Sequence, residues 1–446
     1  MVAHTRLVVM FWLMLAATGL TSCSSPTPPG KSAEESAEAG PSHHSLLFSA
    51  NDSVEVSLEL PSESSFTGHH LQALTISLKA PLESSAVSRE FRTKLERHRV
   101  FTADAKIVVH RDSGDETILV EDCEGTVRSG FLQDGYAHVS AHSDGACGFL
   151  ARAGETFAVH AAKGQNLGAP QKLTGQSSWE CHADQFSSYS PEPQEKASGQ
   201  GTLDTILLAV EVDQKLYQKG IPLPKGIPLK GDPEKSKKAE QVCQDVGELM
   251  AGVFSIYRRE VRLPMQISYL GIWDKEDPYT SNTNNPSTEA TWKKLQKHWM
   301  DNMGGVDRTL TLLLSGVDFG GIAHTEALCS PEENGYAVAG VIALHGDPCP
   351  PKDYFWPFDV VSHELGHNLG ATHTHERKRP IDKCWCPNPC GCSKAVVACN
   401  IDDITPQVGT IMSYCHKSWG KYLKFHDETV EQIRSWIAAP QCKTTD

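Results

Sequence analysis

Three histidines and one glutamate stand at fixed spacing in a short stretch of the C-terminal half, H-E-L-G-H-N-L-G-A-T-H, residues 363–373. His363 and His367 are four positions apart, so on a helix their imidazoles project from one face, about one turn apart. That spacing lets two imidazole nitrogens reach one zinc ion at about 2.0–2.1 Å. Glu364 adjoins the first histidine, where its carboxylate can act as a general base.

Gly370 explains how a third histidine can reach the same metal. A straight helix would carry His373 away, but glycine allows the left-handed turn that ends a helix and reverses the chain. The pattern therefore predicts His363, His367 and His373 as ligands of one catalytic Zn²⁺. Three neutral imidazoles leave the fourth position to water, whose pKa zinc lowers to about 7. The default interpretation of the neighbouring His375 is a surface or core residue.

The elements that must position these residues are predicted from apolar periodicity in residues 201–446. Runs of strand length cover 206–212, 265–273, 310–314 and 337–344, and helical spacing covers 236–257 and 287–303. Strands that alternate with helices predict an α/β fold with one mixed sheet. We expect the tryptophans of the second helix to pack in the core.

The segment before residue 201 has a different pattern. Residues 46–165 contain short runs with period-two alternation, which predicts a mainly β domain. Cys123 and Cys147 lie there in glycine-rich contexts, and an intradomain disulfide is the simplest interpretation. Residues 166–200 are rich in Ser, Gln, Gly and Pro and are interpreted as a linker, which contains the single cysteine Cys181.

The N-terminus indicates export. Residues 1–22 have the length and apolar core of a signal peptide, and residues 23–45 have the composition of a flexible tether. The string L-T-S-C resembles a bacterial lipobox, which makes Cys23 a candidate lipidation site; the alternative is an ordinary signal peptide with a chance cysteine. We therefore expect a cell-surface or outer-membrane lipoprotein, or a secreted protein, that meets the membrane only through a lipid anchor.

Charge and cysteine content narrow the class of protein further. The 446 residues carry a formal net charge of −14, which argues against nucleic acid as a partner, because phosphate binding needs a basic face. The 14 cysteines favour an oxidising compartment. Four of them, in C-W-C-P-N-P-C-G-C, could suggest a second zinc site. They lack the C-x-x-C spacing of zinc ribbons, so disulfides are the better interpretation (Cys384, Cys386, Cys390 and Cys392).

The extended histidine string resembles that of the metzincin zinc endopeptidases. The downstream string G-T-I-M-S-Y-C, residues 409–415, is similar to their Met-turn and is most similar to the reprolysin or ADAM-type branch. The resemblance implies a metzincin catalytic domain over 201–446, with a mixed, mostly parallel sheet, an active-site helix and a Met-turn. It also implies that the mainly β domain at 46–165 is a propeptide.

The same resemblance implies roles for individual residues. His363, His367 and His373 bind zinc, Glu364 is the general base, and Met412 supports the site without being a ligand. Residues 337–344 resemble the edge strand that pairs with an extended peptide substrate.

Several cysteines also acquire roles by resemblance. Cys181 is a candidate cysteine switch, since reprolysin-type propeptides often carry a lone thiolate that occupies the fourth position of zinc. Its W-E-C-H-A-D context departs from the family pattern, as does Thr374 after the third histidine, where the ADAM type has Asp. A structural disulfide or an unmodified thiol is the alternative for Cys181. The favoured disulfide is Cys329 with Cys442.

Together these features predict a zinc-dependent endopeptidase of proteins or peptides, made as an exported zymogen. The alternative is a catalytically silent surface-binding lipoprotein with a retained zinc site, and a metallo-amidase of non-peptide bonds is a third candidate. Calcium is left open as a second ion, because no pattern in the sequence supports it. The sequence does not fix the oligomeric state.

Overall fold

The positions below are those of a computed structural model. It describes residues 55–59, 74–82, 85–123, 127–132, 135–142, 145–152, 155–162, 171–172, 181, 205–219, 235–281, 286–328, 333–341, 355–377, 380–382, 409–415 and 421–438. All of them fall within one compact unit, residues 46–446. The predicted signal peptide, the tether, Cys23, Cys329, Cys442 and the C-W-C-P-N-P-C-G-C cluster lie outside the described residues.

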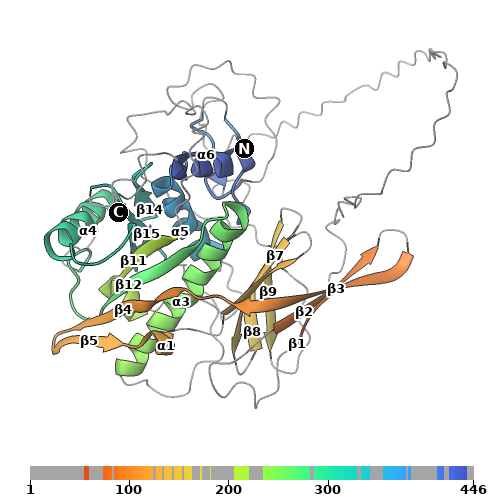
Figure 1. Cartoon of the computed structure of the whole chain (residues 1–446), viewed down its shortest axis with the longest axis horizontal. Helices are drawn as coiled ribbons and strands as arrows, with labels where there is room; N and C mark the ends of the chain where they lie inside the picture. Colours follow the sequence, from red (N-terminus) through yellow and green to blue (C-terminus); the bar gives the residue numbers. More distant parts are fainter. Residues whose placement is uncertain are drawn as a thin grey trace, which may run out of the picture. The chain divides into compact units, whose positions relative to one another are not determined.

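A seven-stranded sheet forms the centre of the fold (Figure 1). In spatial order it consists of β14 (Gly321–Ala323), β15 (Tyr336–Gly340), β13 (Leu310–Ser315), β11 (Ile206–Val212), β12 (Met265–Trp273), β4 (Phe101–Arg111) and β5 (Gly114–Ile118). The four pairings from β15 to β4 are parallel, and β14 and β5 run antiparallel at the two ends. The predicted α/β fold with a mixed, mostly parallel sheet is confirmed.

Helices cover both faces of this sheet, which explains why its central strands are almost continuously apolar. Helices α3 (Lys235–Glu260) and α5 (Phe355–Asn368) lie together against one face and share the larger apolar core. Helix α4 (Thr288–Asn302) packs on the other face, where Trp292 and Trp299 are buried as expected. The remaining helices are α1 (Val120–Cys123), α2 (Gln214–Lys219) and α6 (Asp427–Ile437).

Strands β4 and β5 come from the segment predicted to be a propeptide-like domain, yet they complete the central sheet. Strand β4 pairs in parallel with β12, from Ile267 opposite Phe101 to Trp273 opposite His110. The side chains of Ile107 and Val109 on β4 are fully buried in the core that also contains α3. One sheet therefore joins residues on both sides of the predicted linker.

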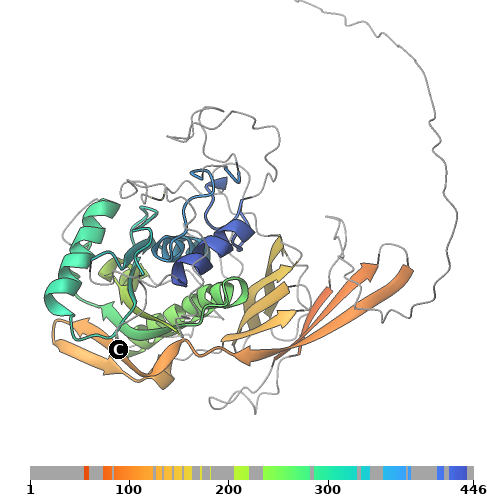
Figure 2. The ribbon, with the colours of Figure 1, turned by 45° about the horizontal axis from the view of Figure 1, so that its top comes forward.

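The rest of the N-terminal segment forms an eight-stranded sheet, which Figure 2 shows beside α3. Its order is β1 (Glu55–Glu59), β2 (Leu74–Leu82), β3 (Ser85–Arg97), β6 (Val127–Leu132), β7 (Gly135–His142), β8 (Gly145–Arg152), β9 (Glu155–Ala162) and β10 (Gln171–Lys172), all antiparallel. His138 on β7 and Phe149 on β8 pack against Phe358 of α5. The mainly β character expected of residues 46–165 is therefore present in the described strands.

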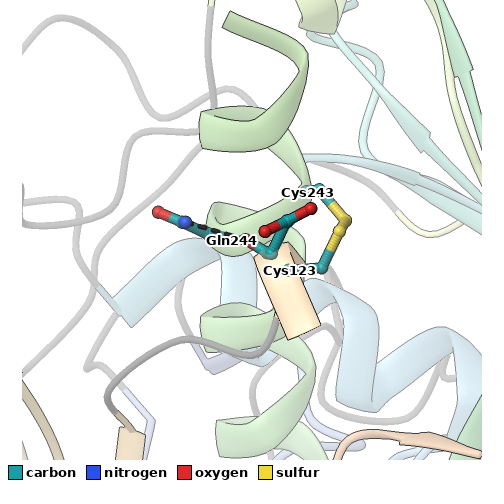
Figure 3. Close-up of a disulfide and its surroundings, with 4 residues drawn as sticks. Cys123, Cys243 and Gln244 are labelled. Carbon is teal, nitrogen blue, oxygen red and sulfur yellow. Dashed lines mark hydrogen bonds between the residues drawn. A yellow bond between two sulfur atoms is a disulfide. The ribbon is translucent and has the colours of Figure 1, made fainter. Parts of the chain in front are cut away.

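The predicted disulfide between Cys123 and Cys147 is wrong. Cys123 bonds to Cys243 instead, 120 positions along the chain (Figure 3). The physical reason is that α1 packs directly on α3, so the two sulfurs meet at the contact between these helices. Pairing within each predicted domain was the simplest assumption, and this disulfide crosses between them.

The predicted edge strand is also wrong. Strand β15 carries the first part of residues 337–344, but it lies between β13 and β14 and is hydrogen-bonded to both. Strand β14 is the outer strand on this side among the described residues. The short strand β14 thus lies outside the longer, apolar β15, and apolar content alone cannot reveal that order.

No helix in the described part of the chain is both long and apolar enough to cross a membrane.

Candidate active site

Helix α5 carries the first half of the histidine motif in the geometry that its spacing predicts. His363, Glu364 and His367 all lie on this helix and are fully buried. The helix ends at Asn368, and two residues later Gly370 has a φ of 92°, in the left-handed region that favours glycine. The amide nitrogen of Ala371 then donates to the Gly366 carbonyl, at 2.9 Å, and the chain turns back. His373 thereby returns to the face of the other two histidines.

The three imidazole rings point their Nε2 atoms toward one another. The Nε2 atoms of His363, His367 and His373 are separated by only 3.1–3.2 Å. These side chains are fully shielded from solvent. Burial, helped by the neighbouring rings and Lys421, holds the pKa of His363 well below its ordinary value. A neutral imidazole is the form that binds a metal.

Each imidazole is held by a hydrogen bond from its other nitrogen. The Nδ1 atoms of His363 and His367 donate to the carbonyls of Ile411 (2.6 Å) and Ala371 (2.8 Å). The Nδ1 atom of His373 donates to a Glu376 carboxylate oxygen at 3.0 Å. Because all three protons are on Nδ1, the three Nε2 lone pairs face one another, which is the arrangement that outer partners impose on metal-binding histidines.

The Met-turn lies directly beneath this triangle. A Cβ atom added to Gly366 of α5 would come within 2.7 Å of the Met412 sulfur, so the methionine side chain packs directly on the backbone of α5 at this glycine. Thr374, which stands where the ADAM type has Asp, donates to the Met412 carbonyl from both its amide (3.0 Å) and its hydroxyl (3.2 Å). The threonine thus supplies a link between the third histidine and the turn.

A buried ion pair between Lys421 and Asp359 supports the Met-turn. Lys421 Nζ lies 2.8 Å from an Asp359 carboxylate oxygen, and the two side chains are 0% and 1% exposed. The same Nζ donates to the Ile411 carbonyl at 2.7 Å, which is also the acceptor for His363. Burial raises the pKa of Asp359 to about 6, although the lysine opposes this shift. Lys421 and Asp359 therefore fix the position of one imidazole.

Cys181 lies at the open side of the three histidines. Its Sγ atom is 3.4 Å from His367 Nε2 and 3.7 Å from a Glu364 oxygen, and the residue is 5% exposed. It takes part in no disulfide. Its backbone forms a parallel bridge to Gly321 of β14, and its carbonyl accepts a hydrogen bond from the Tyr414 hydroxyl at 2.8 Å. Two contacts of the sulfur and two of the backbone thus hold the thiol at the site.

The donor set fits a zinc ion. Three imidazole nitrogens and one thiol sulfur lie within 4.8 Å of one another, and nitrogen and sulfur are the donors that zinc prefers. Glu364 lies beside them without taking part in the cluster. Glycine is needed at position 321, since a Cβ atom there would lie 2.3 Å from a Glu364 carboxylate oxygen. Strand β14 therefore runs immediately alongside Glu364.

The structure brings together all the described residues that the sequence singled out: the three histidines, Glu364, Met412 and Cys181. Sequence reasoning missed Glu376, Lys421 and Asp359. Glu376 follows His373 by three positions, and that spacing was a usable signal. Lys421 and its partner Asp359 are 62 positions apart and give no local signal, because only the fold shows that both are buried.

Comparison with known proteins identifies the domain. Residues 244–374 match the family model described as Metallo-peptidase family M12B Reprolysin-like. Among solved structures, the chain is similar to metalloproteinase-II from Bacteroides fragilis at 12% identity, over 79% of this chain and 89% of that chain, with a TM-score of 0.35. A chaperone–substrate complex is similar at 11% identity, over 76% of this chain and 41% of that chain, with a TM-score of 0.28.

The assignment follows from the family model. That model covers the stretch from the middle of α3 through the whole histidine motif. Residues 244–374 therefore match the reprolysin-like metallopeptidases of family M12B, the branch that the histidine motif resembles.

Proposed function

We propose that this protein is a zinc-dependent endopeptidase that hydrolyses peptide bonds in proteins. The observation that carries the proposal is the triangle of three Nε2 atoms 3.1–3.2 Å apart, each imidazole oriented through Nδ1, with a buried glutamate beside it. His363, His367 and His373 would hold the ion. Zinc, when bound, supplies Lewis-acid chemistry that polarises a carbonyl and makes water a better nucleophile near neutral pH.

Glu364 is the proposed general base. Its carboxylate lies beside the three histidines, where it can accept the proton of the attacking water and then deliver it to the leaving amine nitrogen. Strand β14 is the proposed docking edge for an extended substrate, since its Gly321 already pairs with the backbone of Cys181. A peptide held there would lie next to Glu364.

A zymogen state is part of the proposal. The Cys181 thiol is 3.4 Å from His367 Nε2, on the side where an attacking water and a substrate carbonyl must enter. Zinc binds thiolate strongly, so this contact supports a cysteine switch that blocks the site until the segment leaves. The hydrogen bond from Tyr414 to the Cys181 carbonyl helps to hold the segment there.

Export is proposed mainly from the sequence. The apolar N-terminus and Cys23 support a lipid-anchored or secreted protein, and the Cys123–Cys243 disulfide fits an oxidising compartment. Labelling with radioactive palmitate in a bacterial host tests the anchor. Loss of the label in Cys23→Ala would support lipidation, whereas an unlabelled parent protein would favour simple secretion.

The catalytic proposal is tested in the full-length chain with Cys181→Ala, which removes the thiol without truncation. We expect this variant to hydrolyse casein, to lose activity with a chelator and to regain it with zinc. Glu364→Gln in the same background should lower the rate by about 10²–10⁴-fold while zinc content is kept. A protein that binds zinc but hydrolyses no peptide in any of these forms would favour the silent lipoprotein instead.

A further inference from the structure

The Cys123–Cys243 disulfide joins two parts of the chain that a maturation cleavage would separate. Cys123 ends α1, on the N-terminal side of Cys181, and Cys243 lies on α3 of the metallopeptidase domain. Both cysteines are fully buried. Figure 3 shows the bond at the contact between the two helices, where Gln244 also donates to the Asp122 carbonyl at 2.8 Å.

Noncovalent contacts reinforce this connection. Strand β4 pairs with β12, and Arg111 of β4 forms an ion pair with Asp274, at 2.7 Å, just beyond the end of β12. Phe101, Ile107 and Val109 are at most 2% exposed within the shared core. Residues 101–123 are therefore built into the metallopeptidase fold.

We propose that the N-terminal segment stays on the enzyme as a covalent subunit after cleavage, and that Cys181 is released only by two cuts. A cut after Cys181 leaves it attached, through residues 124–180, to Cys123 and so to α3. A cut between Cys123 and Cys181 leaves it attached to the peptidase domain by the peptide chain. Only cleavage on both sides frees the piece that carries the thiol. The consequence for latency rests on the function proposed above, whereas the covalent retention does not.

The energetics favour continued inhibition after one cut. In either singly cut form a covalent connection remains, and it keeps the thiol at an effective concentration on the order of millimolar or below without any new contact. After a cut beyond Cys181 this connection includes the paired strands β6 to β9. The bridge to Gly321 and the Tyr414 hydrogen bond are unaffected by a distant break. Dilution therefore cannot remove the thiol from a singly cut enzyme.

The test uses full-length protein with a recognition sequence for a site-specific protease inserted after Gln165, after Lys196, or at both positions. After the single cut at the Lys196 insertion, we expect one species on a denaturing gel without reductant and two species with it. Gel filtration with mass spectrometry should show the Cys181 piece leaving only the doubly cut protein. Casein hydrolysis should rise at least tenfold with both cuts and at most about threefold with either one.

Each readout can overturn the proposal. Separation of the N-terminal fragment without reductant would exclude the covalent subunit, and full activity after the single cut at the Lys196 insertion would exclude the need for two. The variant Cys123→Ser/Cys243→Ser is the control, since its fragments should separate on a denaturing gel without reductant. Parent protein with reductant replaces it if the variant does not fold.

If the Cys181 piece stays bound after both cuts while Cys181→Ala hydrolyses casein, the two-cut release is wrong and the endopeptidase function stands. If neither Cys181→Ala nor the doubly cut protein hydrolyses casein, the endopeptidase function fails. The denaturing gel and the release of the Cys181 piece still test the covalent retention and the two-cut release.

Discussion

At the scale of single residues, the candidate site depends on groups that would not touch the metal. Each imidazole has a defined acceptor for Nδ1, two from backbone carbonyls and one from a carboxylate. Backbone acceptors cannot be removed by substitution, but Glu376 can. This residue therefore offers a direct test of how much an outer contact contributes to zinc affinity.

We expect Glu376→Gln to weaken zinc binding by about 10–100-fold, because its charged contact orients His373 and raises the basicity of the ring. The fold should be unaffected, since the Glu376 side chain is 24% exposed. Competition with a chelator of known affinity measures the change. Glu431→Gln, an exposed glutamate on α6, is the matched control and should leave the affinity unchanged. Equal affinities for the two variants would refute the role of Glu376.

The buried pair of Lys421 and Asp359 gives a second prediction at this scale. Lys421→Met leaves a buried carboxyl without its partner, which costs about 3–5 kcal/mol, whereas replacing both members of a buried pair is often nearly neutral. The double variant Lys421→Met/Asp359→Leu should therefore recover most of the lost free energy of unfolding. Urea denaturation of the two single variants and the double variant checks this. Additive losses would show that the two residues act independently.

At the scale of elements, the end of α5 is set by one glycine. Gly370 has a φ of 92°, and an added Cβ atom would lie 2.8 Å from the Trp436 ring of α6. Gly370→Ala should destabilise the protein by about 1–2 kcal/mol from the backbone alone and should displace His373, which weakens zinc binding. Thermal unfolding and zinc affinity are the measurements. Gly304→Ala is the control, since a Cβ atom there meets nothing within 4 Å.

Strand β11 carries a buried carboxyl that should make stability depend on pH. Burial raises the pKa of Glu211 to about 8, against a hydrogen bond from Trp273 Nε1 at 2.7 Å that lowers it. Between the ordinary pKa of Glu, about 4.5, and 8, the unfolded chain has lost this proton and the native state keeps it. Stability from this group is therefore full below pH about 4.5 and falls as the pH rises, by up to about 1.4 kcal/mol per unit.

Replacing this carboxyl by an amide tests that dependence. Glu211→Gln keeps an oxygen acceptor for Trp273 but cannot ionise, so the free energy of unfolding should fall less steeply from pH 5 to 8 than in the parent. Urea denaturation at four pH values gives the two slopes, with Glu431→Gln as the control. Parallel slopes would mean that Glu211 is ionised in the folded protein at neutral pH.

The sequence predicted those elements whose signal is local. Spacing in 363–373 was enough for the active-site helix, its end at Gly370 and the return of His373, because each depends on neighbours within one or two turns. The order of strands in a sheet depends instead on contacts between distant segments. Of β14 and β15, only β15 was predicted as a strand. Nothing local in its apolar run shows that the shorter β14 lies outside it, so the edge was assigned to the wrong strand.

At the scale of the whole molecule, the pairing of Cys123 and the path of β4 required the structure for the same reason. A cysteine pattern fixes how many thiols a segment holds, while the partner depends on which helices pack together. The expected division into a propeptide and a catalytic domain assumed that each buries its own core. The shared sheet and the crossing disulfide instead make residues 101–123 part of the peptidase fold.

This arrangement predicts that a chain starting at Gly201 cannot fold properly. It lacks β4, whose buried Phe101, Ile107 and Val109 each contribute about 1.5–3 kcal/mol, and the disulfide, which contributes about 2–5 kcal/mol. The loss is comparable with the whole stability of a typical domain, about 5–15 kcal/mol. It also exposes an unpaired edge on β12, which favours aggregation.

A chain starting at His98 is the matched comparison, because it keeps β4, β5, α1 and both cysteines of the disulfide. We expect it to be soluble and to unfold cooperatively, and the Gly201 chain to aggregate or to lack a cooperative transition. The His98 chain carries Cys181→Ala and the Gly201 chain lacks residue 181, so latency affects neither protein. Gel filtration and thermal unfolding by circular dichroism distinguish the outcomes. A soluble, cooperatively folded Gly201 chain would show that the metallopeptidase domain forms its core without β4, and that residues 101–123 only bind to a fold already complete.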